Sequence, residues 1–280
     1  MDKRRYNRLK KKSNILIYLA LSVLVCIFIF PVIWVVLSSI KDSTELYSWP
    51  PKFIPDNPTF ENFIAAFEKG NFGTYFLNST FVTVTATVLT LIINTMAGYA
   101  LAKYRFKGDT WLLIGFISTL MIPLEVIMTP IFSVISKLGL YNSLWGIIIP
   151  PAATPTGVFL IRQYLLTVPD ELIEAARIDG AGEWKIFWKL IVPIAKPIIS
   201  VLAIFSFMWR WDDFIWPLIV ISDPTKYTVQ LALSNFIGEF NVDWGSLLAM
   251  SVVTMIPVLI VFLIFQKQFI QGMATSGMKD

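Results

Sequence analysis

The chain has 280 residues, of which 56% are hydrophobic and only 15% are charged, and its formal net charge is +4. Soluble domains carry about a quarter charged residues, so this composition excludes an ordinary soluble fold and favours a membrane protein. The sequence has no histidine and one cysteine, Cys26, which excludes Ser–His triads and an intrachain disulfide framework. The basic residues lie beside apolar segments, which indicates membrane orientation rather than nucleic-acid binding.

Six apolar runs follow one another along the chain. They cover residues 15–40, 76–102, 111–135, 144–166, 194–221 and 246–265. Each can cross about 30 Å of hydrocarbon as a helix that rises about 1.5 Å per residue. Because lipid offers no partner to an open backbone, runs of this length predict helices, with kinks or short breaks at their prolines. The expected fold is an all-α integral membrane protein with six transmembrane helices.

The first apolar run follows a basic N-terminal segment, an order that is also found in signal peptides. The run is too long for the apolar region of such a peptide, and Ile33-Trp34-Val35-Val36-Leu37 is no small-residue cleavage site. We therefore expect an uncleaved transmembrane helix at 15–40.

Charge predicts the orientation of these helices. Basic residues gather in the N-terminal segment and in the loops that follow the second and fourth runs, whereas the other loops hold few unbalanced bases. The positive-inside rule then places both termini and the loop after the fourth run in the cytoplasm. The predicted organisation is a basic cytoplasmic N-terminus at 1–14, a first transmembrane helix at 15–40, an extracellular or periplasmic loop at 41–75, a core of five transmembrane helices at 76–266 that includes a cytoplasmic loop at 167–193, and a cytoplasmic tail at 267–280. A short helix is expected at 59–69 in the external loop.

The cytoplasmic loop at 167–193 is a polar, small-residue segment between two apolar runs. Asp170 after a proline is a good N-cap for a helix from Glu171 to about Ile178, and Gly180 suits the turn that ends it. A second short helix is expected from Glu183 to Leu190, which makes the segment a compact knob of two helices. Small side chains in such a knob would let a partner backbone approach closely. The alternative is an amphipathic loop helix that lies on the bilayer surface.

The residues of this loop resemble a known motif. Glu174-Ala175-Ala176, followed by Gly180 and by Leu190-Ile191-Val192-Pro193, is similar to the EAA loop of ABC importer permeases. That motif usually ends in Ile-x-Leu-Pro, so Leu190 and Val192 are conservative departures. Residues 76–80, 97–102, 141–146 and 214–218 also resemble the carbohydrate-uptake subfamily, in particular its MalG-type subunit. The sequence Trp211-Asp212-Asp213 stands where that subfamily usually has Trp-Asn-Asp.

This resemblance implies a permease subunit that binds no cofactor of its own. In the family the loop is a coupling helix that docks on an ATP-binding subunit, which gives a coupling role to Glu174, Ala175, Ala176, Asp179 and Gly180. The chain has no phosphate-binding loop, so ATP and Mg²⁺ would be bound by partner subunits, and this chain would not be an enzyme. The implied partners are a MalF-type sister permease, two ATP-binding-cassette ATPase subunits, an extracytoplasmic sugar-binding protein and the lipid bilayer of a bacterial plasma membrane.

The outer half of the fifth run contains ionisable and aromatic residues, which are expensive in lipid and usually face a cavity or a partner. Phe205, Trp209, Asp212 and Trp216 would share one face of a continuous helix. Indole rings can pack on the C–H face of a sugar while carboxylates accept its hydroxyls. The candidate residues for a substrate path are Trp209, Asp212, Asp213 and Trp216. The alternative is an aromatic belt at the outer interface, with Arg210 paired to Asp213.

The function predicted from the sequence is that of a transmembrane permease, which forms half of the path for a sugar or oligosaccharide and works by ATP-driven alternating access. Other polar solutes, such as glycerol phosphate or a polyol, remain open. An ion-coupled secondary transporter would be expected to show inverted repeats and buried ionisable pairs at the midplane, and no repeat is visible. A membrane-embedded enzyme would need a nucleophile–base or metal constellation, which the sequence does not offer.

Overall fold

The structure is a computed structural model that describes residues 3–237 and 242–276. The regular elements in these ranges are helices, and one isolated β-bridge joins Ile237 to Val242. The chain divides into two compact units, one made of Met1–Gly70 with Asn235–Thr254 and the other of Asn71–Ser234 with Met255–Asp280. The predicted all-α class is confirmed.

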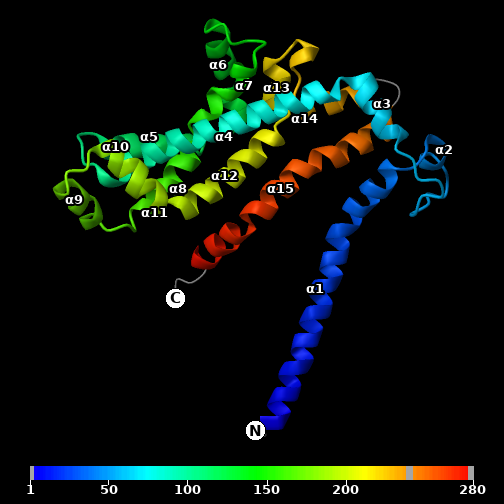
Figure 1. The fold of residues 1–280 in the computed structure, drawn as a ribbon, viewed down its shortest axis with the longest axis horizontal. Coiled ribbons are helices and arrows are strands. Elements are labelled where there is room, and N and C mark those ends of the chain that lie inside the picture. Colours follow the sequence, from blue (N-terminus) through cyan, green and yellow to red (C-terminus); the bar gives the residue numbers. More distant parts are fainter. Residues whose placement is uncertain (1–2, 238–241, 277–280) are drawn as a thin grey trace. The chain divides into compact units, whose positions relative to one another are not determined.

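The first unit contains α1 (Lys3–Ser39), α2 (Ser43–Leu46), α3 (Glu61–Gly70), the end of η4 (Ser234–Phe236) and the beginning of α15 (Trp244–Ser276). Figure 1 shows α1 as one long helix. Its apolar stretch, Leu16–Ser39, matches the predicted first span, although the helix already begins in the basic segment. The short helix expected at 59–69 is confirmed by α3.

Polar contacts fold the segment after α1 back on itself. The Nζ atom of Lys41 donates to the carbonyl oxygen of Lys52 at 2.5 Å and lies 4.5 Å from the ring centroid of Trp34. The side chain of Asn62 donates to the carbonyl oxygens of Ser39 and Lys41 at 2.9 and 2.7 Å. These bonds satisfy backbone groups that the end of α1 leaves open.

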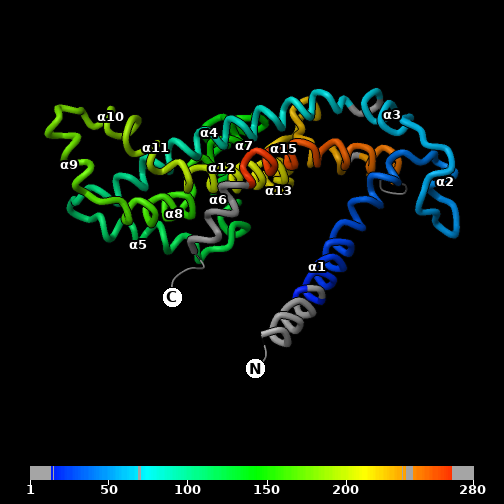
Figure 2. The backbone as a smooth tube through the Cα atoms, turned by 60° about the horizontal axis from the view of Figure 1, so that its bottom comes forward, coloured from blue at the N-terminus to red at the C-terminus, as the bar shows by residue number. Residues whose placement is uncertain are grey.

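The second unit holds the remaining elements. They are α4 (Phe72–Lys103), α5 (Asp109–Thr119), α6 (Leu124–Lys137), α7 (Leu144–Ile148), η1 (Pro150–Ala152), α8 (Pro155–Leu165), α9 (Glu171–Ile178), α10 (Glu183–Ile186), the π-helical η2 (Phe187–Ile191), α11 (Val192–Ile194), α12 (Lys196–Trp211), α13 (Ile215–Val220), η3 (Pro224–Lys226) and α14 (Val229–Leu233), together with the later part of α15. The long helix α4 runs beside α8 and α12 (Figures 1 and 2).

Small residues bring α4 and α8 close together. A Cβ atom added at Gly98 would lie 2.7 Å from Ile161, and one added at Gly157 would lie 2.2 Å from the side chain of Asn94. The amide of Asn94 exchanges two hydrogen bonds with Thr154, at 2.8 and 3.1 Å. Close backbone approach with polar side chains as bridges is the usual way in which helices associate in lipid.

The predicted spans are only partly continuous helices. Within the described residues, four helices or helical stretches are long and apolar enough to cross a membrane, and the number rises to six if two bent pairs each count as one span. The pair α5 and α6 bends by 109° and the pair formed by Glu183–Ile194 and Lys196–Trp211 bends by 78°. Pro123 directly precedes α6, and a proline disfavours helix at the residue before it.

The prediction of one continuous helix across residues 194–221 is wrong. There α12 ends at Trp211, and α13 begins only at Ile215. The backbone between them does not form a regular helix, which changes which side chains of this run can share a face.

Candidate functional site

The loop between α8 and α12 forms the predicted two-helix knob at the end of the second unit where α4 also ends (Figure 1). Its first helix, α9, runs from Glu171 to Ile178 as expected. Asp170 occupies the N-cap position, but its side chain does not cap the helix. It accepts instead from Nζ of Lys103 at 2.6 Å, and this hydrogen bond with its charge holds the pKa of the Asp170 carboxyl below its usual range. The predicted side-chain cap is therefore wrong, because a residue at the end of α4 binds the carboxylate.

The end of α9 is closed by a Schellman motif. The amide of Ala181 donates to the carbonyl oxygen of Ala176, and the amide of Gly180 donates to that of Arg177, both at 3.0 Å. Gly180 has a φ of +74°, in the left-handed region where a side chain is strained. A Cβ atom there would meet nothing within 4 Å, so backbone conformation rather than space calls for the glycine.

The second helix of the knob differs from its predicted extent. Regular α-helix ends at Ile186, and residues 187–191 continue as a π-helix. Pro193 explains the change, because it has no N–H to give to the carbonyl four residues earlier and its ring crowds that carbonyl. The amide of Val192 donates to Phe187, five residues back, as a π-turn requires.

A carboxylate clamp joins the two helices of the knob to α4. Glu183 at the start of α10 accepts from Nε of Arg177 at 2.8 Å and from the hydroxyl of Tyr104. The guanidinium of Arg177 also lies 5.7 Å from the ring centroid of Tyr104, within cation–π range. The bond from Arg177, followed by that from Tyr104, lowers the pKa of the Glu183 carboxyl, and the same pairing raises the pKa of Arg177.

The knob has a buried inner face and an exposed outer face. Ile173, Ile186 and Phe187 are at most 4% exposed and belong to the core cluster that also contains Tyr99 and Leu202. The outer face of α9 carries four exposed residues at helical spacings, Glu171, Glu174, Ala175 and Ile178.

The predicted coupling residues divide between these faces. Glu174, Ala175, Asp179 and Gly180 are exposed, whereas Ala176 is half-buried against the core. The sequence reasoning missed Ile178, whose side chain is 86% exposed beside Glu174 and Ala175. The available signal was an isoleucine on the polar face, directly before an Asp-Gly turn.

The four substrate-path candidates fall into two pairs. Trp209 is 47% exposed and stacks on Phe205, with ring centroids 5.7 Å apart and an interplanar angle of 28°. Asp212 is exposed, and its Oδ1 accepts from Nε2 of Gln230 at 3.4 Å.

The second pair supports the start of α13. Asp213 accepts from the amide of Trp216 at 3.3 Å, and Trp216 is buried, with Nε1 donating to the carbonyl oxygen of Gly146 at 3.2 Å. The common face predicted for Phe205, Trp209, Asp212 and Trp216 is therefore wrong for Trp216. Arg210 and Asp213 attract each other but form no direct ion pair, and Nη2 of Arg210 donates to the carbonyl oxygen of Pro151 at 2.7 Å.

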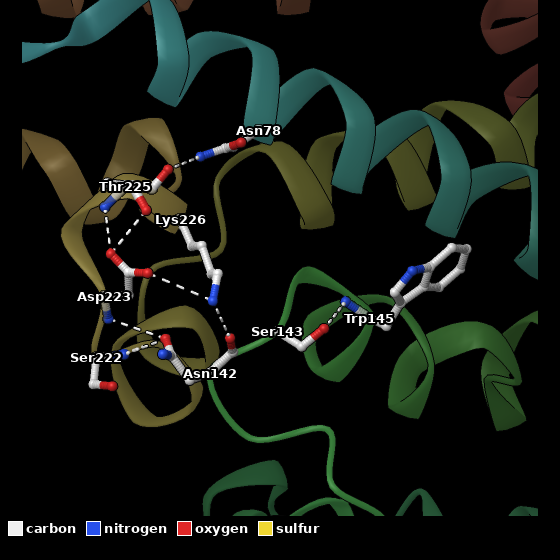
Figure 3. A network of polar contacts seen from close by, with 8 residues as sticks. All are labelled: Asn78, Asn142, Ser143, Trp145, Ser222, Asp223, Thr225 and Lys226. Atoms are coloured by element: carbon white, nitrogen blue, oxygen red, sulfur yellow. Dashed lines mark hydrogen bonds and ion pairs between the residues drawn. The ribbon is translucent and has the colours of Figure 1, made fainter.

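A separate polar network centres on Asn142 (Figure 3). Its side-chain oxygen accepts from the amides of Ser222 and Asp223 at 3.2 and 3.0 Å, and its carbonyl oxygen accepts from Nζ of Lys226 at 3.0 Å. Asn78 in α4 donates to two carbonyl oxygens of the same loop. The network ties the turn before α7 and the loop after α13 to the start of α4. Across the described residues, no group of three or more His, Cys, Asp or Glu side chains could hold a metal ion.

Residues 94–275 match the family described as the inner membrane component of binding-protein-dependent transport systems, and the chain belongs to this family. It is similar to the arabinooligosaccharides transport system permease protein AraQ of Halalkalibacterium halodurans, with 38% identity over 90% of this chain and 92% of the relative. It is also similar to the diacetylchitobiose uptake system permease protein NgcG of Streptomyces coelicolor, with 33% identity over 90% and 84%. The sn-glycerol-3-phosphate transport system permease protein UgpE of Yersinia pestis is 30% identical over 95% of this chain and 98% of the relative.

A solved structure has the same fold. One chain of a bacterial ABC transporter involved in the import of the acidic polysaccharide alginate matches with a TM-score of 0.84 and 26% identity, over 93% of this chain and 97% of that chain. The protein is thus a transporter permease subunit and not an enzyme, and ATP hydrolysis belongs to a separate subunit.

Proposed function

We propose that this chain forms one half of the translocation path of an ABC importer for a sugar or oligosaccharide, in a bacterial plasma membrane. The observation that carries the proposal is the knob at 167–193, which presents an exposed apolar and acidic face while Asp170 and Glu183 tie it to Lys103 and Tyr104 at the end of α4. The similarity to arabinooligosaccharide and diacetylchitobiose permeases over nine-tenths of the chain supports a saccharide as the substrate. The sn-glycerol-3-phosphate relative makes a small phosphorylated polyol the second candidate.

The proposed topology has six spans, with each bent helix pair counted as one. Both termini and the knob lie in the cytoplasm, in agreement with the positive-inside rule, and the loop at 41–75 lies outside. A MalF-type sister permease supplies the other half of the path, two ATPase subunits power it, and an extracytoplasmic binding protein delivers the substrate. A solved transporter structure that includes a periplasmic protein with a bound alginate pentasaccharide has the same general fold and is consistent with such an assembly.

In this proposal the outer face of α9 docks on the ATPase. Glu174, Ala175 and Ile178 make the contact, Asp179 and Gly180 shape its edge, and Ala176 holds the helix to the core. Movement of the ATPase reaches α4 through the pair Lys103–Asp170 and through the clamp on Glu183. The substrate path is lined by Trp209 and Asp212, whereas Asp213 and Trp216 support the break that presents them.

The docking proposal is tested by charge changes on the outer face. The variants Glu174→Lys and Ile178→Asp, expressed with the native partners, should still insert and co-purify with the sister permease. Co-purification of the ATPase subunits and substrate uptake should both fall by about tenfold or more, because the few residues that dominate an interface cluster near its centre and each cost about 2 kcal/mol or more when changed.

The matched control is Glu68→Lys, a charge reversal at an exposed position of α3 outside the knob. It should leave uptake and ATPase binding unchanged. Normal uptake by both Glu174→Lys and Ile178→Asp would overturn the assignment of α9 as the coupling helix.

A further inference from the structure

Two neighbouring helical segments of the second unit are interrupted. The path from α7 to α8 is broken around residues 149–154, and the path from α12 to α13 is broken at residues 212–214. Irregular backbone at membrane depth is tolerated only where protein covers it or where it lines a water-filled cavity. In secondary transporters, a different class, broken helices of this kind mark substrate sites.

The two breaks are joined by hydrogen bonds to open carbonyls. Pro150 and Pro155 have no N–H, so the carbonyls four residues earlier, at Gly146 and Pro151, lack their helical donors. Nε1 of Trp216 donates to Gly146 at 3.2 Å, and Nη2 of Arg210 donates to Pro151 at 2.7 Å. The prolines therefore create acceptors that side chains flanking the second break fill.

The side chain of Arg210 bonds at the place where the two breaks meet. Besides the bond from its Nη2 to Pro151, its Nε atom is buried and has no partner among the described residues. The same carbonyl also accepts from the hydroxyl of Thr90 in α4 at 3.2 Å. The guanidinium thus points into packed protein and is withdrawn from the exposed side of the break.

The exposed side of the break carries a flat ring and, three residues further along the chain, a carboxylate. Trp209 is 47% exposed, and its indole is held against Phe205 by stacking at 5.7 Å. Asp212 directly follows α12, and its carboxylate is held by the amide of Gln230 in α14 at 3.4 Å. Because α12 has 16 residues, it places Asp212 about 24 Å along the helix axis from Lys196, at a rise of about 1.5 Å per residue. An exposed carboxylate within a membrane-spanning run requires water or a polar partner.

The chemistry of these side chains fits a neutral saccharide. The indole face packs on the C–H face of a pyranose or furanose, the carboxylate of Asp212 accepts from hydroxyls, and the amide of Gln230 can donate and accept. With Arg210 withdrawn and Asp213 bound to the amide of Trp216, the exposed charge of the break is the negative charge of Asp212.

We propose that Trp209, Asp212 and Gln230 form a contact site that takes a neutral sugar ring and disfavours uronates and sugar phosphates. This proposal rests on the proposed function, and it chooses the neutral saccharide over the phosphorylated polyol.

The test is a binding measurement that does not depend on coupling to the ATPase. The assembled transporter in lipid nanodiscs, without ATP, is titrated with arabinotriose and with trigalacturonate, and saturation transfer from protein to ligand is recorded by NMR. Arabinotriose should give saturation transfer with the native protein. In Trp209→Ala the affinity read from this transfer should weaken about tenfold, which corresponds to about 1.4 kcal/mol. Trigalacturonate should give little transfer to the native protein and more to Asp212→Asn.

Two controls keep the result interpretable. Trp209→Phe keeps a flat aromatic face and should retain most of the arabinotriose signal. Trp244→Ala removes an indole of similar exposure, 46%, from the start of α15, outside the knob, and should change nothing. Stronger binding of trigalacturonate than of arabinotriose, or an unchanged arabinotriose signal in Trp209→Ala, would overturn the site. Failure of the importer function itself would instead show in the uptake and co-purification experiments on α9.

Discussion

The Nζ atom of Lys103, the last residue of α4, lies 2.6 Å from Oδ1 of Asp170, which immediately precedes α9. The same ammonium donates to the carbonyl oxygen of Val168 at 2.5 Å, and its side chain is only 4% exposed. One buried cation thus fixes both the chain that leads into the knob and the first turn of its helix. This contact and the bond from Tyr104 to Glu183 are the ties that connect the knob to the end of α4.

The first prediction concerns this cation. Lys103→Met keeps most of the apolar stem but removes both hydrogen bonds; the bond to the carbonyl of Val168 can contribute about 1.5–3 kcal/mol, and the pair with Asp170, which is 74% exposed, about 0–1 kcal/mol. We expect substrate-stimulated ATPase activity of the assembled transporter to fall by about tenfold, with near-normal basal hydrolysis. Lys107→Met, at an exposed position a few residues further on, should leave both rates unchanged. Equal behaviour of the two variants would show that Lys103 carries no coupling.

The second prediction concerns the Schellman turn. Gly180→Ala forces a side chain into a left-handed conformation at a cost of about 1–2 kcal/mol, with no steric clash, since nothing lies within 4 Å of the added Cβ. We expect the knob to be loosened and substrate uptake to fall severalfold. Gly182→Ala is the matched control, because Gly182 has a φ of −68° and equally open space. If Gly182→Ala impairs uptake as much as Gly180→Ala, backbone strain is not the cause.

Local signals predicted the elements that local chemistry determines. The α9 helix, its glycine turn and α3 follow from helix-breaking residues and apolar spacing, which act within a few residues. Hydropathy could not locate the break after Trp211, because the residues on both sides remain apolar and aromatic. The side chains that flank the break donate to acceptors at Gly146 and Pro151, which lie far away in the sequence.

Tertiary partners likewise decided which candidate residues are presented. Glu174 and Ala175 could be assigned to the outer face from the motif, but the half-burial of Ala176 depends on packing against the core. Aspartate is a favoured N-cap residue, yet the carboxylate of Asp170 binds a lysine from another helix instead of capping α9. Trp209 and Trp216 are both tryptophans, so residue type alone does not distinguish them. The indole of Trp216 is buried and donates to Gly146, whereas that of Trp209 is exposed.

The third prediction is a pH dependence of the knob. The pKa values of Asp170 and Glu183 are lowered, chiefly by the hydrogen bonds from Lys103 and Arg177 respectively. A lowered pKa in the folded state contributes stability at pH values above the ordinary carboxyl pKa values of about 3.9 and 4.3, and this stability is lost as the pH falls through the folded values. The ties made by these two carboxylates should therefore hold the knob in place from pH 7 to about pH 5, and the knob should loosen below about pH 4.

A spin label at exposed Ala175 reports this loosening as an increase in side-chain mobility. In Glu183→Gln the label should already be more mobile at pH 7, because the charged bond to Arg177 is lost, and the acid transition should become smaller. Release of the native knob between pH 6 and 7 would contradict the assignment of these two carboxylates as its acid-sensitive ties.

The last prediction separates the structural indole from the exposed one. In Trp216→Phe the ring that packs near Val220 and Ile147 is largely kept, but the carbonyl of buried Gly146 loses its donor. An unsatisfied buried acceptor costs about 1–3 kcal/mol, and each kcal/mol lowers Tm by about 2–4 °C in a chain of this size class. We expect a lower Tm of the detergent-solubilised transporter and unchanged arabinotriose affinity in the surviving folded fraction.

Trp145→Phe is the control for Trp216→Phe, since Trp145 is 45% exposed and lies in the same helix as Gly146. Its Tm should change by less than the equivalent of about 0.5 kcal/mol, as is usual for exposed positions. The opposite pattern is expected for Trp209→Ala, which should lose arabinotriose affinity with little change in Tm because its ring is half exposed. If Trp216→Phe lost ligand affinity at an unchanged Tm, the indole would contact substrate directly, and the junction between the two helix breaks would not depend on it.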